Sequence, residues 1–294
     1  MPEPPPIRSY LYAPGSDPHV MEKALAAGAD AVILDLEDAV AAEDKLAARG
    51  HVAAVIARAG GTAPGMGPTE LHVRVNHGPH GPDPDDVAAV TASGLTGIRL
   101  PKIGSADEVR AVAAALDPLE RAAGMAPDTV RLYLSIETAA AALAAAELAA
   151  APRVARLVFG ATDFLADIAS PGTTDGPATT LARGMLVLAS RAAGIGAPVD
   201  CVHTALDDDE GLRRSARSAR ELGFFGKSVI HPRQIPAVHE VFTPSVAELS
   251  EARRVLAHVE AHGDGASTLD GHMIDAAVVA RARRLIAMAE PSRR

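Results

Sequence analysis

The sequence predicts an α/β protein whose strands and helices form a (β/α)8 TIM barrel, followed by a C-terminal helical extension. Eight short apolar segments of strand-like composition alternate with alanine-rich segments of helical periodicity over about 240 residues. Parallel strands need helical crossovers between them, and eight strand–helix units are the number that closes this barrel. An open doubly wound sheet is the alternative, but no GxGxxG sequence follows a strand.

The predicted strands are short apolar runs, most of which end at a polar residue. They are residues 10–14, 31–38, 71–76, 97–102, 131–137, 154–160, 198–203 and 227–232. The clearest helical segments between them are residues 18–29, 43–59, 105–117 and 207–223. Several helical segments begin at Ser or Asp and end at Gly, as helix caps favour.

More helical sequence follows the last strand. Residues 246–262 predict one helix, the Gly-rich segment 263–272 interrupts the pattern, and a last helix begins near Ile274. The length of 294 residues does not by itself require a second domain. We therefore predict a catalytic TIM barrel over residues 1–243 and a helical lid or extension over residues 244–294.

Composition excludes several classes of partner. The formal net charge is −9, and no basic stripe is present that could neutralise the phosphates of a nucleic acid. Cys201 is the only cysteine, so neither an intrachain disulfide nor a Cys/His zinc site is expected. The N-terminus lacks the layout of a secretory signal, and Glu147 interrupts the longest apolar run. These features predict a cytoplasmic protein that binds neither nucleic acid nor membranes.

The polar residues that end the strands are the candidates for function, because TIM-barrel enzymes build their active sites at the C-terminal ends of the strands. The second predicted strand, in "AVILDLEDAV", brings three carboxylates to this position. The strand-end residues are Asp35, Glu37, Asp38, Arg74, Asn76, Lys102, Glu137, Asp163 and His231.

Several carboxylates in one confined site favour a bound cation, because like charges at short distance otherwise force one of them to stay protonated. Mg²⁺ binds oxygen ligands and usually takes only one or two protein carboxylates, with waters in the remaining positions. We predict Glu137 and Asp163 as direct ligands, with Glu37 and Asp38 binding the metal-bound waters. The alternative is that these acids cap helices, which is common for Asp and Glu at helix N-termini.

Arg74 lies in the apolar segment "HVRVN", where a guanidinium needs an anionic partner. A substrate carboxylate bound by both ends of the guanidinium is one such partner, and a structural salt bridge is the other. The Gly- and Pro-rich setting of His72, His77 and His80 predicts solvated loop residues rather than a metal cluster. Cys201 is expected to be a small core residue.

Seven blocks of the sequence, in order, resemble the CitE-like proteins, a group that includes the citrate lyase β subunit, malyl-CoA lyase and citramalyl-CoA lyase. The blocks are "RSYLYAPGSDPHVMEKALAAGADAVILDLEDAVAAEDKLAAR", "VRVN", "LPKIGSADEV", "SIETAAA", "VFGATDFLADI", "GFFGKSVIHPRQIPAVHEVFTPS" and "LDGHMIDAAVVARARRL". The resemblance covers nearly the whole chain. It implies a Mg²⁺-dependent TIM-barrel enzyme that cleaves or forms the carbon–carbon bond of a 3-hydroxyacyl thioester.

The resemblance also implies roles for residues that lie in these blocks. Glu137 and Asp163 match the metal ligands of the family, and Arg74 matches its substrate-contacting arginine. The backbone of Ala161, Thr162 and Asp163 is similar to the segment that receives the keto-acid carboxylate. Asp275 matches an aspartate that a neighbouring subunit supplies as the acid–base group. This match implies a homotrimer or a hexamer.

Four further residues match positions that line the CoA site of the family, namely Tyr12, Lys23, Ile230 and His231. One position departs from the family pattern. Where malyl-CoA lyases have an arginine after "PGS", this chain has Asp17. A negative charge near the CoA phosphates would weaken CoA binding, so this position does not favour CoA as the thiol carrier.

The expected function is cleavage of a 3-hydroxyacyl-CoA such as malyl-CoA or citramalyl-CoA into a small keto acid and an acyl-CoA. A thioesterase with malate synthase-like chemistry is one alternative, because the same acids could activate a water molecule. A citrate lyase β subunit that acts on a carrier-protein thioester is another, although the "LDGHMID" tail favours a self-contained CoA enzyme. A non-catalytic binding protein would need an altered catalytic position, and none of the matched positions is altered.

Overall fold

The computed structural model describes residues 6–59, 69–263 and 265–289. These residues form two compact units, of which the larger is Ile7–His239 and the smaller contains the chain from Glu240 onward. None of the described helices is long and apolar enough to span a membrane.

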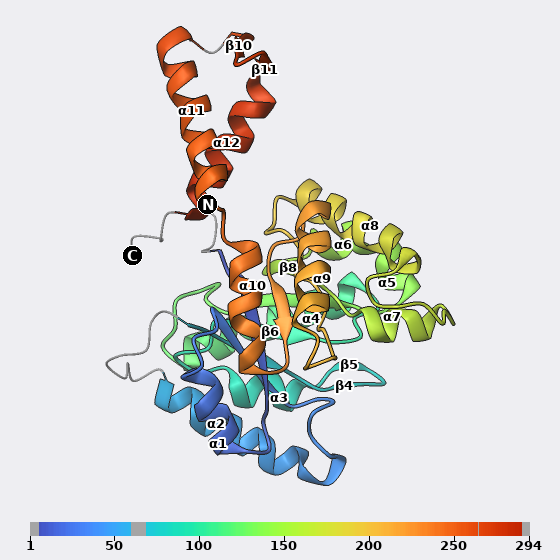
Figure 1. Cartoon of the computed structure of the whole chain (residues 1–294). Coiled ribbons are helices and arrows are strands. Elements are labelled where there is room, and N and C mark those ends of the chain that lie inside the picture. The colour runs from blue at the N-terminus through green and yellow to red at the C-terminus, as the bar shows by residue number, and fades with distance from the viewer. Residues whose placement is uncertain (1–5, 60–68, 264, 290–294) are drawn as a thin grey trace. The chain divides into compact units, whose positions relative to one another are not determined.

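The larger unit is built around a parallel sheet (Figure 1). The sheet has seven strands in the order β8-β7-β6-β3-β2-β1-β9. They are β1 (Ser9–Pro14), β2 (Ala31–Asp35), β3 (Glu70–Arg74), β6 (Gly97–Leu100), β7 (Arg131–Ile136), β8 (Val154–Phe159) and β9 (Lys227–Val229). Two short strands, β4 (His77–Gly78) and β5 (Gly81–Pro82), form a separate hairpin.

The segment predicted as a strand at residues 198–203 closes the sheet into a barrel, but only through isolated bridges. Val199 pairs with Val158 of β8, and Asp200 pairs with Lys227 of β9, both in parallel. The amide of Val199 donates to the carbonyl of Leu157, and the amide of Asp200 donates to that of Gly226. The segment therefore occupies the position of the eighth strand, and the predicted TIM-barrel fold is confirmed.

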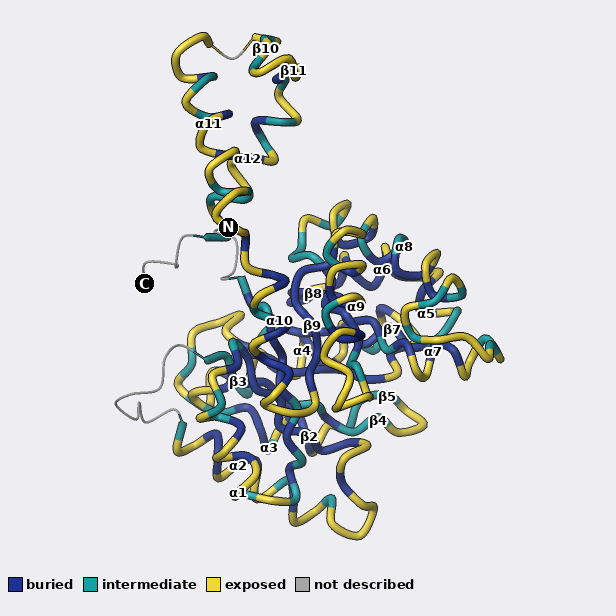
Figure 2. Tube along the Cα trace, viewed as in Figure 1, coloured by how far each residue is buried: buried dark blue, intermediate teal, exposed yellow. Residues whose placement is uncertain are grey.

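Helices follow the strands along the chain and cover the outside of the barrel. In the larger unit they are α1 (Pro18–Leu25), α2 (Lys45–Ala59), α3 (Pro84–Val90), α4 (Ala106–Ala122), α5 (Ala139–Leu143), α6 (Ala145–Ala149), α7 (Ala161–Asp167), α8 (Pro177–Ala193) and α9 (Asp209–Leu222). Two 3-10 turns are η1 (Ala42–Asp44) and η2 (Pro232–Gln234), and α10 (Ile235–Phe242) spans the boundary between the units. Figure 2 shows the strands as buried chain and the outward surfaces of these helices as exposed.

The interior of the barrel is more polar than a simple aliphatic core. Tyr10, His72 and Tyr133 are buried inside it, and the ring centroids of His72 and Tyr133 are 4.3 Å apart. Gly97 provides the space for both rings. A Cβ at position 97 would lie 2.7 Å from Cδ2 of His72 and 2.8 Å from Cε2 of Tyr133. A larger residue there would therefore push the rings apart.

The prediction of solvated histidines in the third strand and the loop after it is wrong for His72. His72 is fully buried, and its Nε2 lies 3.0 Å from Oε2 of Glu70. His77 is half-buried, and its Nε2 lies 2.9 Å from Oε2 of Glu108, whereas His80 is exposed. The Gly and Pro residues that suggested a loop begin only after β3, and inside the strand the alternation of faces turns His72 inward.

The C-terminal unit contains α11 (Val246–His262), α12 (Ala276–Ala289) and a hairpin of β10 (Ser267–Leu269) and β11 (His272–Ile274). Part of the Gly-rich interruption is thus a β-hairpin. Its turn residues Asp270 and Gly271 have φ values of 49° and 80°, which suit a tight Asp-Gly turn. Buried apolar residues of α11 and α12, with Ile274 of β11, form the small core of this unit.

Candidate active site at the C-terminal ends of the barrel strands

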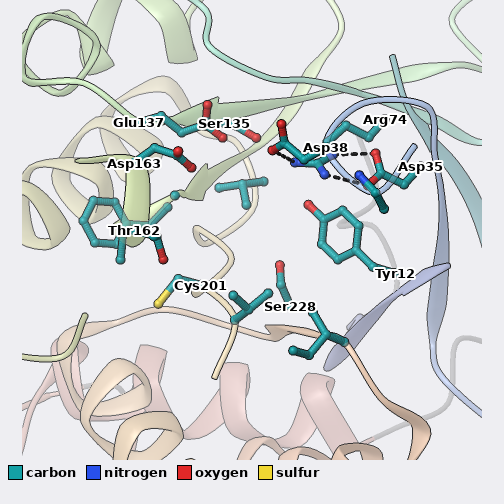
Figure 3. Close-up of a pocket in the computed structure, with 17 residues that line it drawn as sticks. Tyr12, Asp35, Asp38, Arg74, Ser135, Glu137, Thr162, Asp163, Cys201 and Ser228 are labelled. Carbon is teal, nitrogen blue, oxygen red and sulfur yellow. Dashed lines mark hydrogen bonds and ion pairs between the residues drawn. The ribbon is translucent and has the colours of Figure 1, made fainter. Parts of the chain in front are cut away.

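A cavity of about 380 Å³ lies at the C-terminal ends of the barrel strands. It brings together eight of the residues predicted for the site, which are Tyr12, Asp38, Arg74, Glu137, Ala161, Thr162, Asp163 and Ile230. Other residues that line it include Asp35, Ser135, Gly160, Cys201 and Ser228. Figure 3 shows Glu137 and Asp163 next to one another, and Arg74 beside Asp35 and Asp38.

Glu137 and Asp163 form a carboxylate pair on neighbouring elements. Glu137 follows β7 and is only 6% exposed, and its Oε2 accepts a hydrogen bond of 2.9 Å from the amide of Lys102. Asp163 lies in the first turn of α7 and is exposed. Burial, and next the charge of Asp163, raise the pKa of Glu137 to about 7. A cation that neutralises both carboxylates would stabilise the pair.

Gly160 makes the position of Glu137 possible. A Cβ at residue 160 would lie only 2.3 Å from Cγ of Glu137 and 3.0 Å from its Oε1. The glycine between β8 and α7 therefore lets a buried glutamate from the adjacent strand reach the cavity.

The donor set suits a hard divalent cation such as Mg²⁺. The described residues contain no cluster of three or more His, Cys, Asp or Glu side chains that could hold a metal alone. Mg²⁺ does not need such a cluster, because it commonly takes one or two carboxylates and completes its shell with water and substrate oxygens. In the described part of the chain, the carboxylate of Asp163 has no hydrogen bond or ion pair of its own.

Arg74 is held by the carboxylates of the second strand. Its Nε and Nη2 donate to the two oxygens of Asp35 at 2.7 and 2.6 Å. Its Nη1 lies 2.9 Å from Glu37 Oε2 and 3.2 Å from Asp38 Oδ2. Asp35 also accepts from the amides of Glu37 and Ala39, which fixes its orientation. The strand that ends in "LDLED" thus holds this arginine, and the salt bridge considered from the sequence is present.

Glu37 and Asp38 differ in their surroundings. Glu37 is buried, does not line the cavity, and accepts a hydrogen bond of 2.6 Å from Nζ of Lys102. Burial raises its pKa even though Arg74 and Lys102 oppose this effect. Asp38 lines the cavity, and its side chain is 58% exposed. In this structure both acids pair with cationic side chains, and contact with metal-bound waters remains a prediction.

The first turn of α7 offers free backbone donors. Gly160 precedes this helix and supplies no side-chain cap. The amides of Ala161, Thr162 and Asp163 precede the first intrahelical hydrogen bond, which runs from Phe164 to the carbonyl of Gly160. All three residues line the cavity, so their amides are available to an anionic group there.

Four residues predicted for the site do not line this cavity, and one of them is the buried Glu37 described above. Lys23 is exposed on α1, and His231 is exposed and accepts a hydrogen bond at Nδ1 from the amide of Arg233. Asp275 belongs to the C-terminal unit, where its Oδ1 accepts from the amides of Ala277 and Val278 and caps α12.

Asp17, the residue that departs from the family pattern, caps α1. Its Oδ1 accepts from the amides of His19 and Val20 at 2.9 and 3.2 Å. An aspartate is a preferred residue at this helix position. Its carboxylate therefore has a structural role that does not depend on a ligand.

Sequence reasoning missed three polar residues at or next to the cavity, namely Ser135, Ser228 and Arg99. Ser228 of β9 lines it, and Arg99 of β6 lies buried behind it, where its Nη1 donates to Tyr12 Oη and Ser228 Oγ. No local sequence pattern indicated Arg99, because the side to which it points follows from its register with Arg74 on the neighbouring strand.

Comparisons with known proteins place the chain in one enzyme family. Residues 8–232 match the model of the HpcH/HpaI aldolase/citrate lyase family, and residues 184–290 match that of the C–C bond lyases of the TIM-barrel fold. A (3S)-malyl-CoA thioesterase of Cereibacter sphaeroides is 38% identical over 97% of this chain and 95% of its own. An L-malyl-CoA/β-methylmalyl-CoA lyase of the same organism is 36% identical over 98% of this chain and 97% of its own.

Among solved structures, CitE of Mycobacterium tuberculosis in complex with magnesium, acetoacetate and coenzyme A is similar with a TM-score of 0.75. It is 33% identical, and the alignment covers 97% of this chain and 98% of CitE. Together with the barrel and its carboxylate pair, these matches show that the chain is an enzyme of the HpcH/HpaI aldolase/citrate lyase family.

Proposed function

We propose that this protein is a Mg²⁺-dependent carbon–carbon lyase. Its proposed substrate is a 3-hydroxyacyl-CoA thioester such as malyl-CoA or citramalyl-CoA, which it would cleave into a small keto acid and an acyl-CoA. The observation that carries the proposal is one cavity that combines the Glu137 and Asp163 carboxylates, the free amides of α7 and the guanidinium of Arg74. A related lyase and the ligands named for CitE support it.

Glu137 and Asp163 are the residues that would hold Mg²⁺. The raised pKa of Glu137 supports this assignment, because a cation between the two carboxylates would remove the repulsion that contributes to it. When bound, Mg²⁺ would act as a Lewis acid that polarises the hydroxyl and carboxylate oxygens of the substrate. Glu37 and Asp38, beside this pair, are proposed to orient metal-bound waters.

Different protein groups would bind the two parts of the substrate during cleavage. The amides of Ala161 to Asp163 would receive the carboxylate of the keto-acid portion. Arg74 would stabilise the hydroxyl oxygen as its proton passes to a water molecule and the oxygen becomes a carbonyl. The bond between the hydroxyl-bearing carbon and the carbon next to the thioester breaks. Its electron pair moves onto the thioester fragment and forms an enolate.

Asp275 is the proposed acid that gives a proton to the enolate carbon, and the base that removes this proton in the reverse reaction. We propose that the C-terminal unit acts as a lid and supplies Asp275 to the barrel of a neighbouring subunit in a homotrimer or hexamer. In its observed position the carboxylate caps α12 through one oxygen, Oδ1, which leaves Oδ2 for a substrate.

Mixed oligomers test this exchange. Arg74→Ala and Asp275→Ala proteins should each be nearly inactive, because every site lacks one essential group. Hybrids made by co-expression combine intact barrels with intact tails at some sites, so part of the activity should return. Hybrids verified by native mass spectrometry that are no more active than either parent would show that Asp275 serves its own barrel or is not catalytic.

A thioesterase is the second candidate function, because the malyl-CoA thioesterase is 38% identical to this chain. The two activities differ in their products. A lyase releases keto acid and acyl-CoA without free thiol, whereas a thioesterase releases free CoA. We therefore suggest a panel of hydroxyacyl-CoA esters, with hydrazone detection of keto acid and a thiol reagent for CoA, each with Mg²⁺ and with EDTA. Full turnover after exhaustive EDTA treatment would contradict the proposed metal dependence.

A further inference from the structure

Arg99 is a buried cation without a carboxylate partner in the described part of the chain. The residue is fully buried in β6, and its Nε and Nη2 have no hydrogen-bond partner among the described residues. The rings of Tyr10 and Tyr12 lie against it, each with its centroid 5.3 Å from Cζ of the guanidinium. Such stacking offsets only part of the cost of burying a charge. The positive charge of Arg99 is therefore largely uncompensated.

The other cations near the cavity are already neutralised. Arg74 contacts the three carboxylates of Asp35, Glu37 and Asp38, and Lys102 shares two of them. Among the described residues no carboxylate neutralises Arg99, so its positive charge contributes to the electrostatic potential in the cavity.

Arg99 acts on the cavity through two hydroxyl groups. Its Nη1 donates to Tyr12 Oη at 2.9 Å and to Ser228 Oγ at 3.2 Å. A guanidinium can only donate, so both hydroxyl oxygens must accept from it. Each hydroxyl then keeps its own hydrogen for a different acceptor. No such acceptor is present among the described residues, and Figure 3 shows both hydroxyls pointing into the cavity.

Two hydroxyls that are both hydrogen-bonded to one buried cation favour an oxygen with negative charge. A neutral acceptor would gain less from the charge behind them. The negative groups Glu137 and Asp163, with their proposed cation, form a separate part of the same cavity. The cavity thus has a carboxylate region for a metal-bound group and a hydroxyl region for a second, anionic oxygen.

We infer that the hydroxyls of Tyr12 and Ser228 bind the thioester carbonyl oxygen and stabilise the enolate that forms there, with Arg99 as their positioning residue. This inference rests on the proposed lyase function. When the carbon–carbon bond breaks, its electron pair forms a double bond to the thioester carbon, and the carbonyl π electrons move onto the oxygen. The two hydroxyls donate hydrogen bonds to this oxygen, and no proton is transferred from them.

The inference predicts a loss of enolate formation in variants that lack one hydroxyl. Tyr12→Phe keeps the ring that lies against Arg74 and Arg99 and removes only the hydroxyl, which donates into the cavity and accepts from Nη1 of Arg99. Ser228→Ala removes the other donor. Preorganised donors of this kind are typically worth about 10²- to 10³-fold in rate. We expect each variant to lower kcat by about 10²-fold, with little change in the KM for the keto acid in the condensation direction.

Exchange of the α-hydrogens of acetyl-CoA or propionyl-CoA with D₂O measures enolate formation directly. The assay contains Mg²⁺, and mass spectrometry follows the exchange. Tyr133→Phe is the matched control, because Tyr133 is buried in the same barrel but bonds Glu70 rather than lining the cavity. Exchange should fall about 10²-fold in Tyr12→Phe and Ser228→Ala, and remain near the wild-type rate in Tyr133→Phe.

Arg99→Gln tests the positioning role, because its amide can still donate one hydrogen bond while the charge is lost. Thermal unfolding shows whether the variant is folded, and its exchange rate should fall while the KM for the keto acid stays near that of the wild type. Wild-type exchange in both folded hydroxyl variants would overturn the inference and leave the proposed lyase intact. No exchange in the wild-type protein would instead overturn the lyase function and this inference together.

Discussion

Replacing Gly160 by alanine is the sharpest test of the proposed metal ligand, because the structure gives the size of the perturbation. The new Cβ would lie 2.3 Å from Cγ of Glu137, whereas ordinary contacts begin near 3.4 Å. Glu137 must therefore move by about 1 Å, and displacements of this size in a catalytic group can lower rates by about 10²-fold. The crowding itself should lower the free energy of unfolding by about 1–3 kcal/mol.

Gly184→Ala is the matched control for this substitution. Gly184 lies inside α8, and a Cβ there would meet no heavy atom within 4 Å. Alanine is favoured over glycine within a helix by about 1 kcal/mol, so this variant should be slightly more stable and fully active.

Isothermal titration with Mg²⁺ and steady-state kinetics of both variants complete the experiment. We expect Gly160→Ala to bind Mg²⁺ more weakly and to lose about 10²-fold in kcat. A folded Gly160→Ala protein with the wild-type Mg²⁺ affinity and kcat would refute the assignment of Glu137 as a ligand.

Three further predictions follow from the site. Arg74→Lys should lower kcat/KM by about 10²-fold, because an ammonium cannot keep both hydrogen bonds to Asp35 and also bind a substrate oxygen. Near-normal kinetics with a lower Tm would favour a purely structural salt bridge. The pKa of Glu137 is about 7 in the folded protein, against an ordinary 4.5, so the Mg²⁺-free protein should lose about 3 kcal/mol of stability as pH rises from 4.5 through 7. Unfolding measured at several pH values tests this expectation. Glu137→Gln should abolish the loss, and persistence of the full loss in this variant would assign it to other groups. Asp17→Asn keeps a good helix cap while removing the charge, so Tm should stay constant. A lower KM for the CoA ester in this variant would show that the Asp17 carboxylate had opposed CoA binding.

Much of the barrel and its functional edge could be predicted from the sequence, because local patterns determine them. Apolar runs of strand length recur between helical segments, and a strand keeps its alternating faces whatever surrounds it. Once the fold is a barrel, each strand end points to one mouth. This reasoning placed Arg74, Glu137 and Asp163 in a common region, and the structure has all three lining one cavity.

The pairing of charges was decided only by the tertiary structure. Arg74 was expected to need an anion, but its partner Asp35 lies 39 residues earlier and meets it through the register of β2 and β3. The arrangement of the barrel strands also places Arg99 of β6 beside two hydroxyls and without a carboxylate partner among the described residues. Which side chains share an interior layer depends on the stagger between strands, and this stagger is not contained in the pattern of any one segment.

The sequence by itself therefore determined the kinds of group that reach the mouth of the barrel, since strand periodicity and strand ends are local properties. The tertiary structure decided their partners, and with these their charge states and roles. It turned His72 inward, gave Asp17 a helix to cap and placed Gly160 where only a missing Cβ leaves room for Glu137. The physical reason is that desolvation and Coulomb interactions depend on distances between segments that are far apart along the chain.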